Sequence, residues 1–181
     1  MKIKTLAAAM LIAGASGLTH AEGFNYTYVE ATYQIYSELD AYQWEVKGSY
    51  QVNDQFYIAF EDGNLPTNIY TPASANGRSF SGGLIVPMDN GMNIYAQLGL
   101  ADNTVDMYPI LEAGLRVAAN EQVEIRGALR IEPEGFGGDG ETYIIGEGLY
   151  HMSERVALTG GIVLPSEADG NVLRFGARLK F

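Results

Sequence analysis

Apolar and polar residues alternate along most of this chain with a period of two, which is the spacing of a β-strand with one apolar face. Segment 122–132 shows the pattern most clearly. Its apolar positions fall on one face and its charged positions on the other: Val123, Ile125, Gly127, Leu129 and Ile131 against Glu124, Arg126, Ala128, Arg130 and Glu132. At the helical spacing of about 3.6 residues the same charges would spread around the whole cylinder, so the pattern predicts a strand.

Ten segments of this kind are separated by breaks that are alternately short and longer. The predicted strands are 24–36, 43–52, 55–62, 78–87, 92–101, 108–118, 122–132, 142–151, 155–164 and 171–181. The short breaks lie at 53–54, 89–91, 119–121 and 153–154. Short turns on one side and longer loops on the other are typical of a closed, antiparallel, up-and-down transmembrane β-barrel with both chain ends on the periplasmic side. A barrel of eight strands is the alternative, if 55–62 and 78–87 are loop.

The first residues have the pattern of an export signal. Lys2 and Lys4 form a short basic region, residues 6–18 are apolar or small, and Thr19-His20-Ala21 offers small residues for cleavage. We therefore expect a signal peptide over 1–21 and one outer-membrane barrel domain over 22–181. A transmembrane anchor fits less well, because the apolar run is too short and too rich in glycine and alanine to span about 30 Å of hydrocarbon.

The composition agrees with an all-β chain and excludes several functions. The 181 residues include 22 glycines and 12 tyrosines, which favours short strands and tight turns over packed helices. A net charge of −11 argues against a nucleic-acid partner. Because there is no cysteine, the chain has no disulfide, no thiolate metal site and no cysteine for a lipid anchor.

The charge distribution indicates which face points inward. A soluble lipocalin-like barrel has an apolar interior, whereas a membrane barrel has an apolar exterior. Seven of the nine basic residues after position 21 lie on polar strand faces together with seven acidic ones, and the longer breaks hold almost only acids. We therefore predict a lumen filled by paired charges, which are Glu30, Glu45, Lys47, Glu61, Glu112, Arg116, Glu124, Arg126, Arg130, Glu132, Glu147, Arg174, Arg178 and Lys180.

Two further expectations concern these charges. Strand parity places Glu147 inside, whereas aligning IGEGLY with LEAGLR places it outside; we expect it inside, because a lipid-facing carboxylate is costly. The first and last strands are neighbours in a closed barrel, which brings Glu30 near the arginines of 171–181. The partners expected for Arg126, Arg130, Arg174 and Arg178 are Glu112, Glu124, Glu132 and Glu30.

The C-terminus, VLRFGARLKF, ends on an aromatic residue with apolar residues at every second position before it. It resembles the last strand of Gram-negative outer-membrane β-barrel proteins, in which a final Phe is recognised during assembly. The matching positions are Phe175, Ala177, Leu179 and Phe181. The strand rhythm of the rest, including NYTYVEATYQ and ILEAGLRVAANEQVEIRGAL, looks like the small porin-like or OmpX-like barrels. The resemblance implies a monomer that meets the barrel-assembly machinery, outer-membrane lipid and lipopolysaccharide.

Aromatic residues on the predicted outer face gather near the strand ends, as in the two aromatic girdles of a membrane barrel. Those toward the longer breaks are Trp44, Phe60 and Phe80. Those toward the short turns are Tyr50, Phe56, Tyr150 and Phe181.

Candidate catalytic and metal-binding residues are few. After the signal peptide the chain has one histidine, His151, and His151-Met152-Ser153 superficially resembles the His-x-Ser of the lipid A deacylase family. The predicted topology places it at a periplasmic turn, whereas that family acts at the outer leaflet. The acidic loops lack the spacing of a calcium loop. We expect no catalytic residues, no metal and no cofactor.

These patterns lead to one functional hypothesis and two alternatives. The hypothesis is an outer-membrane barrel with a filled lumen and a structural or interaction role at the cell envelope. The first alternative is a narrow, cation-favouring diffusion pore, for which small interior residues would leave room: Ser49, Ala59, Gly99, Gly114, Ala128, Thr159, Gly161 and Gly176. The second, a lipid-modifying barrel enzyme, has the weakest support, so the chain is predicted not to be an enzyme.

Overall fold

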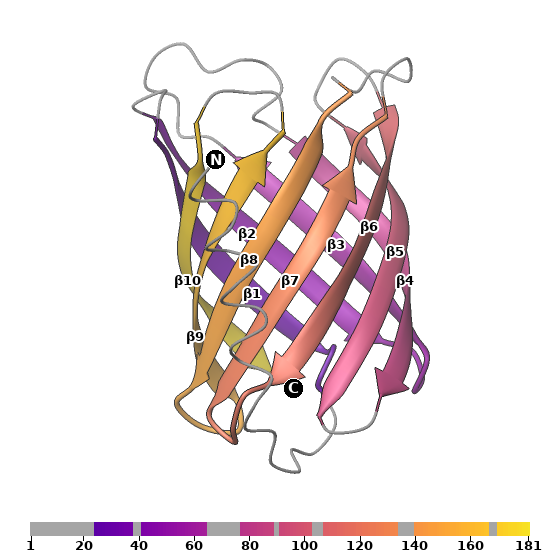
Figure 1. Cartoon of the computed structure of the whole chain (residues 1–181), viewed down its shortest axis with the longest axis vertical. Coiled ribbons are helices and arrows are strands. Elements are labelled where there is room, and N and C mark those ends of the chain that lie inside the picture. The colour runs from indigo at the N-terminus through magenta and orange to yellow at the C-terminus, as the bar shows by residue number, and fades with distance from the viewer. Residues whose placement is uncertain are drawn as a thin grey trace.

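The structure, a computed structural model, describes residues 24–37, 41–64, 77–88, 91–102, 107–133, 140–166 and 170–181. In this part of the chain ten antiparallel strands close into one barrel, in which each strand pairs with its sequence neighbours and β1 pairs with β10 (Figure 1). The strands are β1 Tyr28–Tyr36, β2 Ala41–Gln51, β3 Phe56–Asn64, β4 Gly77–Met88, β5 Met92–Asp102, β6 Met107–Ala118, β7 Val123–Ile131, β8 Thr142–His151, β9 Val156–Pro165 and β10 Val172–Lys180. None of the described residues belongs to a helix that could cross a membrane.

The predicted up-and-down barrel of ten strands is confirmed. The alternative of eight strands is wrong, because 55–62 and 78–87 correspond to β3 and β4, which pair with each other. The predicted signal peptide, 1–21, lies outside the described residues.

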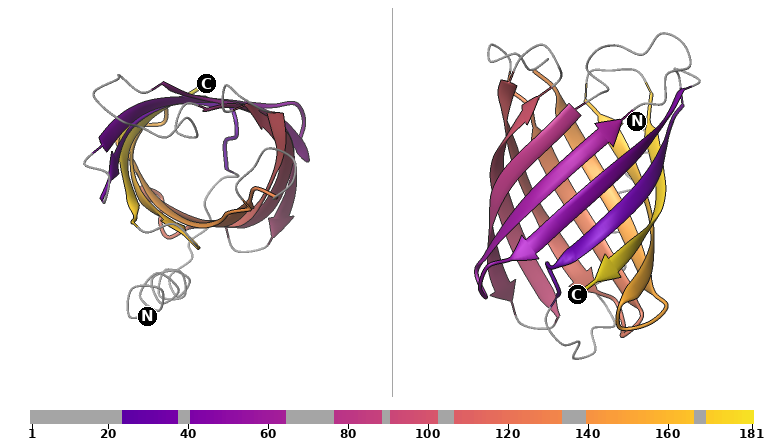
Figure 2. Two further views of the ribbon diagram at one scale, coloured as in Figure 1. Left: turned by 90° about the horizontal axis from the view of Figure 1, so that it is seen from above. Right: turned by 180° about the vertical axis from the view of Figure 1, so that it is seen from behind.

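The first strand begins at Tyr28 and not at residue 24 as the alternation predicted. On one side the pairing stops where β10 stops. Tyr28 lies opposite Lys180 in β10, and the last backbone bond of the pair runs from Phe181 N to Thr27 O at 3.2 Å. On the other side β2 continues to Gln51, but residues 24–27 do not pair with it in the ladder, and the indigo start of the described chain lies inside the ring (Figure 2, left).

Three of the short connections share one turn geometry. Asn53, Asn120 and Ser153 each use a side-chain oxygen to accept hydrogen bonds from the backbone N–H groups two and three residues later, at 2.9 to 3.3 Å. Short polar side chains favour such turns because they replace a backbone acceptor. The three turns lie at the same end of the barrel as Phe181 (Figure 1).

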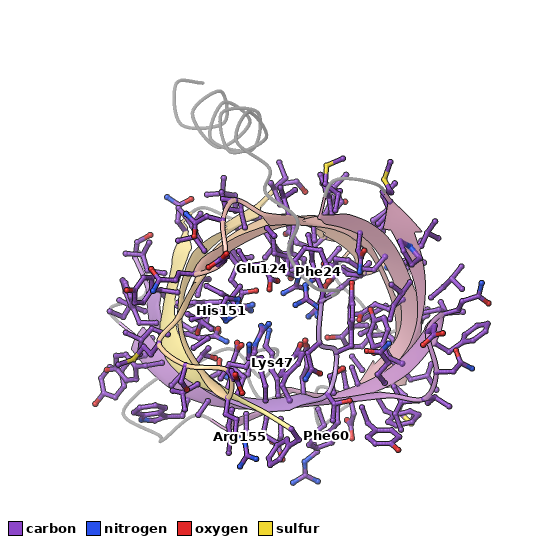
Figure 3. All side chains as sticks on the ribbon, turned by 90° about the horizontal axis from the view of Figure 1, so that it is seen from below. Phe24, Lys47, Phe60, Glu124, His151 and Arg155 are labelled. Carbon is purple, nitrogen blue, oxygen red and sulfur yellow. The ribbon has the colours of Figure 1, made fainter. Side chains whose placement is uncertain are left out.

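The two faces of the barrel wall differ sharply in chemistry. On β10 the outward side chains of Leu173, Phe175 and Leu179 are 39%, 53% and 44% exposed, whereas inward Arg178 is 3% exposed. In Figure 3 Lys47 lies inside the ring of strands, and Phe60 lies outside it. Most of the large, exposed side chains on the outer face of the strands are apolar or aromatic. Such an outer face is typical of a barrel surrounded by lipid.

Aromatic residues mark both ends of the outer surface. Near the loop end the ring of Tyr33 lies 5.1 Å from Trp44, and Phe60 lies opposite Phe80 in the sheet. Near the turn end the exposed rings are Tyr50, Phe56, Tyr150 and Phe181. These are the positions expected of two interfacial girdles.

Two inward tyrosines are placed by glycines on the neighbouring strand. A Cβ at Gly83 would lie 2.1 Å from Cζ of Tyr57, and a Cβ at Gly114 would lie 2.5 Å from the hydroxyl of Tyr95. Any side chain at either position would displace the ring. The glycines therefore let both rings lie flat on the wall, and this directs their hydroxyl groups toward the polar residues of the lumen.

Candidate functional site: the charged lumen

The lumen holds a continuous series of ion pairs in which the sign of the charge alternates at every step. We call this series the ion-pair belt; in order it consists of Arg174, Glu45, Lys47, Glu61, Arg130, Glu112, Arg126, Glu147, Arg178 and Glu30. Its members come from β1, β2, β3, β6, β7, β8 and β10. Acidic and basic side chains are equal in number within the belt.

The belt crosses the lumen at one contact. Nη2 of Arg130 on β7 donates to both carboxylate oxygens of Glu61 on β3, at 3.0 and 2.9 Å. β3 and β7 are separated by three strands in the barrel, so these two side chains bridge the interior and are not neighbours on the wall. Lys47 also contacts Glu61, with Nζ 3.4 Å from Oε1.

Glu112 on β6 is the most enclosed member of the belt. Its side chain is 0% exposed and accepts hydrogen bonds from Arg126, from Arg130 Nε at 3.0 Å and from the Tyr95 hydroxyl at 2.9 Å. The Tyr95 hydroxyl in turn accepts from Arg126 Nε at 2.7 Å. Charged groups buried with several donors in this way are held in a fixed arrangement, because losing one partner leaves another charge unpaired.

The other end of the belt joins the first and last strands. Arg178 lies opposite Glu30 in the β1–β10 pair, where its Nε donates to Glu30 Oε2 at 2.6 Å and its Nη2 lies 2.6 Å from the same oxygen. Arg178 also lies 3.8 Å from Glu147, and its guanidinium lies 4.0 Å from the centre of the Tyr28 ring. This ion pair therefore links β1 and β10, the two strands that close the barrel, on the lumen side.

A second, smaller group of charges lies at the turn end. Arg116 donates to both oxygens of Glu124, at 2.6 and 3.0 Å. Nε2 of His151 lies 3.6 Å from the same carboxylate, and Nδ1 of His151 lies 3.4 Å from Nζ of Lys180. Glu124 and His151 both face the lumen in Figure 3.

Residues 24–27 enter the lumen beside this group. The guanidinium of Arg116 lies 4.8 Å from the ring centre of Phe24 and 4.3 Å from that of Tyr26. The Tyr26 ring is 4.9 Å from the Tyr57 ring, and Tyr26 is 4% exposed. Nδ2 of Asn25 donates to the backbone oxygen of Phe181 at 2.9 Å, which connects the segment to the end of the chain.

The residues predicted for the lumen are placed as follows. Twelve of the fourteen take part in a carboxylate–cation pair, and Glu147 is among them, with Oε2 3.0 Å from Arg126. Lys180 contacts His151, and Glu132 is half-buried just beyond the end of β7. Some partners differ from expectation: Arg174 lies 3.5 Å from Glu45, and Glu124 pairs with Arg116.

Sequence reasoning missed the tyrosines and glutamines that complete the lumen. Tyr57 donates to Gln97 at 3.0 Å, and Gln34 donates to Glu45. The alternation along each strand could have identified these neutral residues, because they occupy positions that face the lumen. The pattern of charges does not reveal them. The proposed assembly residues Phe175, Leu179 and Phe181 point outward and are exposed, where another protein could contact them.

The described residues offer little for catalysis. The Ser153 hydroxyl is engaged in the turn, where it accepts from the backbone of Arg155 and Val156, while His151 points into the lumen. The two side chains therefore do not form a His–Ser pair. Among the residues that the structure describes, no group of three or more His, Cys, Asp or Glu side chains could hold a metal ion.

Comparison with known proteins gives the class of fold. No protein-family model matches the chain, and no curated protein sequence matches it. The solved NanC porin is similar, with a TM-score of 0.59 and 11% identity over 84% of this chain and 100% of that one. The KdgM porin has a TM-score of 0.55 and 11% identity over 86% and 99% of the two chains. The chain thus has the fold of porin-like outer-membrane β-barrels, as its sequence predicted.

Proposed function

We propose that this chain is an outer-membrane barrel whose lumen is closed by its own side chains and whose role is structural or interactional at the cell envelope. The apolar outer face, the two aromatic girdles and the porin-like fold support a place in the outer membrane. The signal peptide expected at 1–21 supports export, and the shared position of the short turns and Phe181 supports a periplasmic location for both ends. Lipopolysaccharide, outer-membrane lipid and the barrel-assembly machinery are the proposed partners.

The observation that carries the proposal is the crossing of the lumen by Arg130 and Glu61. A ten-stranded barrel is only slightly wider than one whose interior its own side chains can fill. Two long side chains that meet from opposite walls, each paired with further belt members, leave little room for a solute to pass. To open the passage, the buried Arg130–Glu61 ion pair would have to separate, which is costly in a dry interior.

A narrow, cation-favouring pore is the second candidate, and one observation favours it. Several buried lumen oxygens have no hydrogen-bond partner among the described protein groups, including Glu30 Oε1, Thr32 Oγ1, Ser49 Oγ and Thr159 Oγ1. Water would satisfy them, and a connected file of water could carry small ions. The similar KdgM porin has also been solved in complex with disordered oligogalacturonate, so a barrel of this fold can bind a solute.

Conductance of the purified chain in planar bilayers separates the two candidates. The closed barrel predicts no resolvable current steps in KCl. Regular steps with a preference for K⁺ over Cl⁻ would instead establish the pore. A non-enzymatic role is part of the proposal and is supported by the porin fold of the neighbours and by the separation of Ser153 from His151.

A further inference from the structure

The second obstruction in the lumen is formed by residues that lie outside the barrel wall. Residues 24–27 precede β1 and make none of its ladder pairs except through Thr27. If the expected signal peptide is removed after Ala21, this segment lies two residues from the free end of the mature chain. An aromatic segment at a free end has no reason to enter a polar lumen unless specific contacts hold it there.

Three contacts of this kind involve the rings of Phe24 and Tyr26. Arg116, 4% exposed and fixed by both oxygens of Glu124, lies against the faces of Phe24 and Tyr26. A guanidinium within about 6 Å of a ring centre attracts the ring face, most strongly where water is excluded. The third contact is the Tyr57 ring, which packs on Tyr26 and is itself seated over Gly83.

Polar contacts fix the backbone of the segment. Asn25 O accepts from Nη1 of Arg116 at 3.4 Å, and Tyr26 N donates to Oε1 of Gln51 at the same distance. Together with the Asn25–Phe181 bond, these contacts attach the segment to β6, to β2 and to the chain end. Residues 24–26 are held by these side-chain contacts and by packing with Tyr57 and Tyr95, whereas each wall strand is held by two backbone ladders. No ladder bond of the wall therefore has to break for the segment to leave the lumen.

We propose that residues 24–27 form a removable plug that closes the turn end of the lumen by docking Phe24 and Tyr26 on Arg116. The plug and the ion-pair belt are then two barriers in series, one at the turn end and one across the middle. This inference rests on the proposed closed barrel, and it adds a part of the chain whose release would regulate access to the lumen from the periplasmic side.

Thiol labelling tests the plug directly, because the natural chain has no cysteine. The reporter is Ser49→Cys, an inward position of β2 that is 8% exposed and lies deeper in the lumen than Gln51, which contacts Tyr26. The variants are Phe24→Ser/Tyr26→Ser, which removes both docking rings, and Tyr26→Phe, which keeps the ring. Asp54→Cys in an exposed turn calibrates the reagent.

With a water-soluble maleimide and folded protein in detergent, the double serine change should speed labelling of the Ser49→Cys reporter at least about tenfold over the reporter alone. Adding Tyr26→Phe should leave the reporter as slow as before, and labelling of the Asp54→Cys calibrant should not change. Equal reporter rates with and without the double serine change, whether fast or slow, would overturn the plug. The heat-dependent gel shift of folded barrels confirms that each variant is folded. Conductance of the unaltered chain tests the closed barrel separately, so the two failures are distinguishable.

Discussion

At the scale of single residues, the lumen shows how burial makes each charge dependent on its partners. Glu112 accepts from two arginines and a tyrosine and has no exposed surface, whereas the outer pair Arg78–Asp62, at 3.3 Å, has an arginine side chain 68% exposed. The first arrangement is enclosed by protein, whereas the arginine of the second is largely exposed on the outer surface.

We predict that Glu112→Gln lowers the stability of the barrel far more than Asp62→Asn. The first change leaves Arg126 and Arg130 with less negative charge to balance them, at a cost of about 3 to 5 kcal/mol if the lumen is dry and much less if it is wet. The second should cost at most about 1 kcal/mol. Thermal unfolding in detergent, followed by the loss of the heat-dependent gel shift, gives both values. Equal small effects would indicate a hydrated lumen.

A second residue-scale prediction concerns the packing of the Tyr57 ring against Gly83. Gly83→Val should displace the Tyr57 ring and lower the unfolding temperature, because a Cβ there would lie 2.1 Å from the ring. Gly82→Val is the matched control: it lies next in sequence on the outer face, with nothing within 4 Å of the added Cβ. A larger effect at Gly82 than at Gly83 would contradict the described packing.

At the scale of strands, the sequence predicted most of what the structure contains, because each strand has one polar and one apolar face. β7 and β10 were predicted to within two residues at each end, and the inward parity of their arginines follows from the same alternation. Partner choice was harder to predict. Arg174 pairs with Glu45 across β1, a contact that depends on strand register and tilt, neither of which alternation reveals.

The start of β1 shows the other limit of sequence reasoning. Residues 24–27 continue the alternating pattern, but β10 offers no partner beyond Lys180, and the segment does not pair with β2 although β2 continues to Gln51. Local pattern therefore gave the wrong boundary, and the contacts of Arg116 with the two rings decide where the segment goes.

The two faces of β10 allow opposite predictions from neighbouring positions. Arg178→Met should leave assembly intact and lower the unfolding temperature, since it leaves Glu30 and Glu147 without their shared cation. Arg174→Met should do the same through Glu45. Leu179→Arg should instead reduce insertion into the outer membrane, because it places a charge on the lipid-facing surface. Membrane fractionation and gel shift separate the outcomes, and normal insertion of Leu179→Arg would refute the assigned outer face.

At the scale of the whole molecule, the account requires a fixed orientation in the membrane. With single cysteines, a membrane-impermeant reagent added to intact cells should label Ala73→Cys and Gly138→Cys, which lie in two of the longer breaks of the sequence. It should not label Asn53→Cys or Asn120→Cys in the short turns. All four should react after the cells are broken, and the reverse pattern in intact cells would reject the topology.

Closure of the lumen by the ion-pair belt can be measured by single-channel conductance in planar bilayers. With Phe24→Ser/Tyr26→Ser as background, so that the plug is released, the belt is the remaining barrier. Adding Glu61→Ala/Arg130→Ala, which removes the crossing contact, should produce steady current steps. Adding Asp62→Ala/Arg78→Ala, the adjacent outer pair, should produce none. Equal currents in the two variants, or steps of the same size in the unaltered chain, would contradict the account.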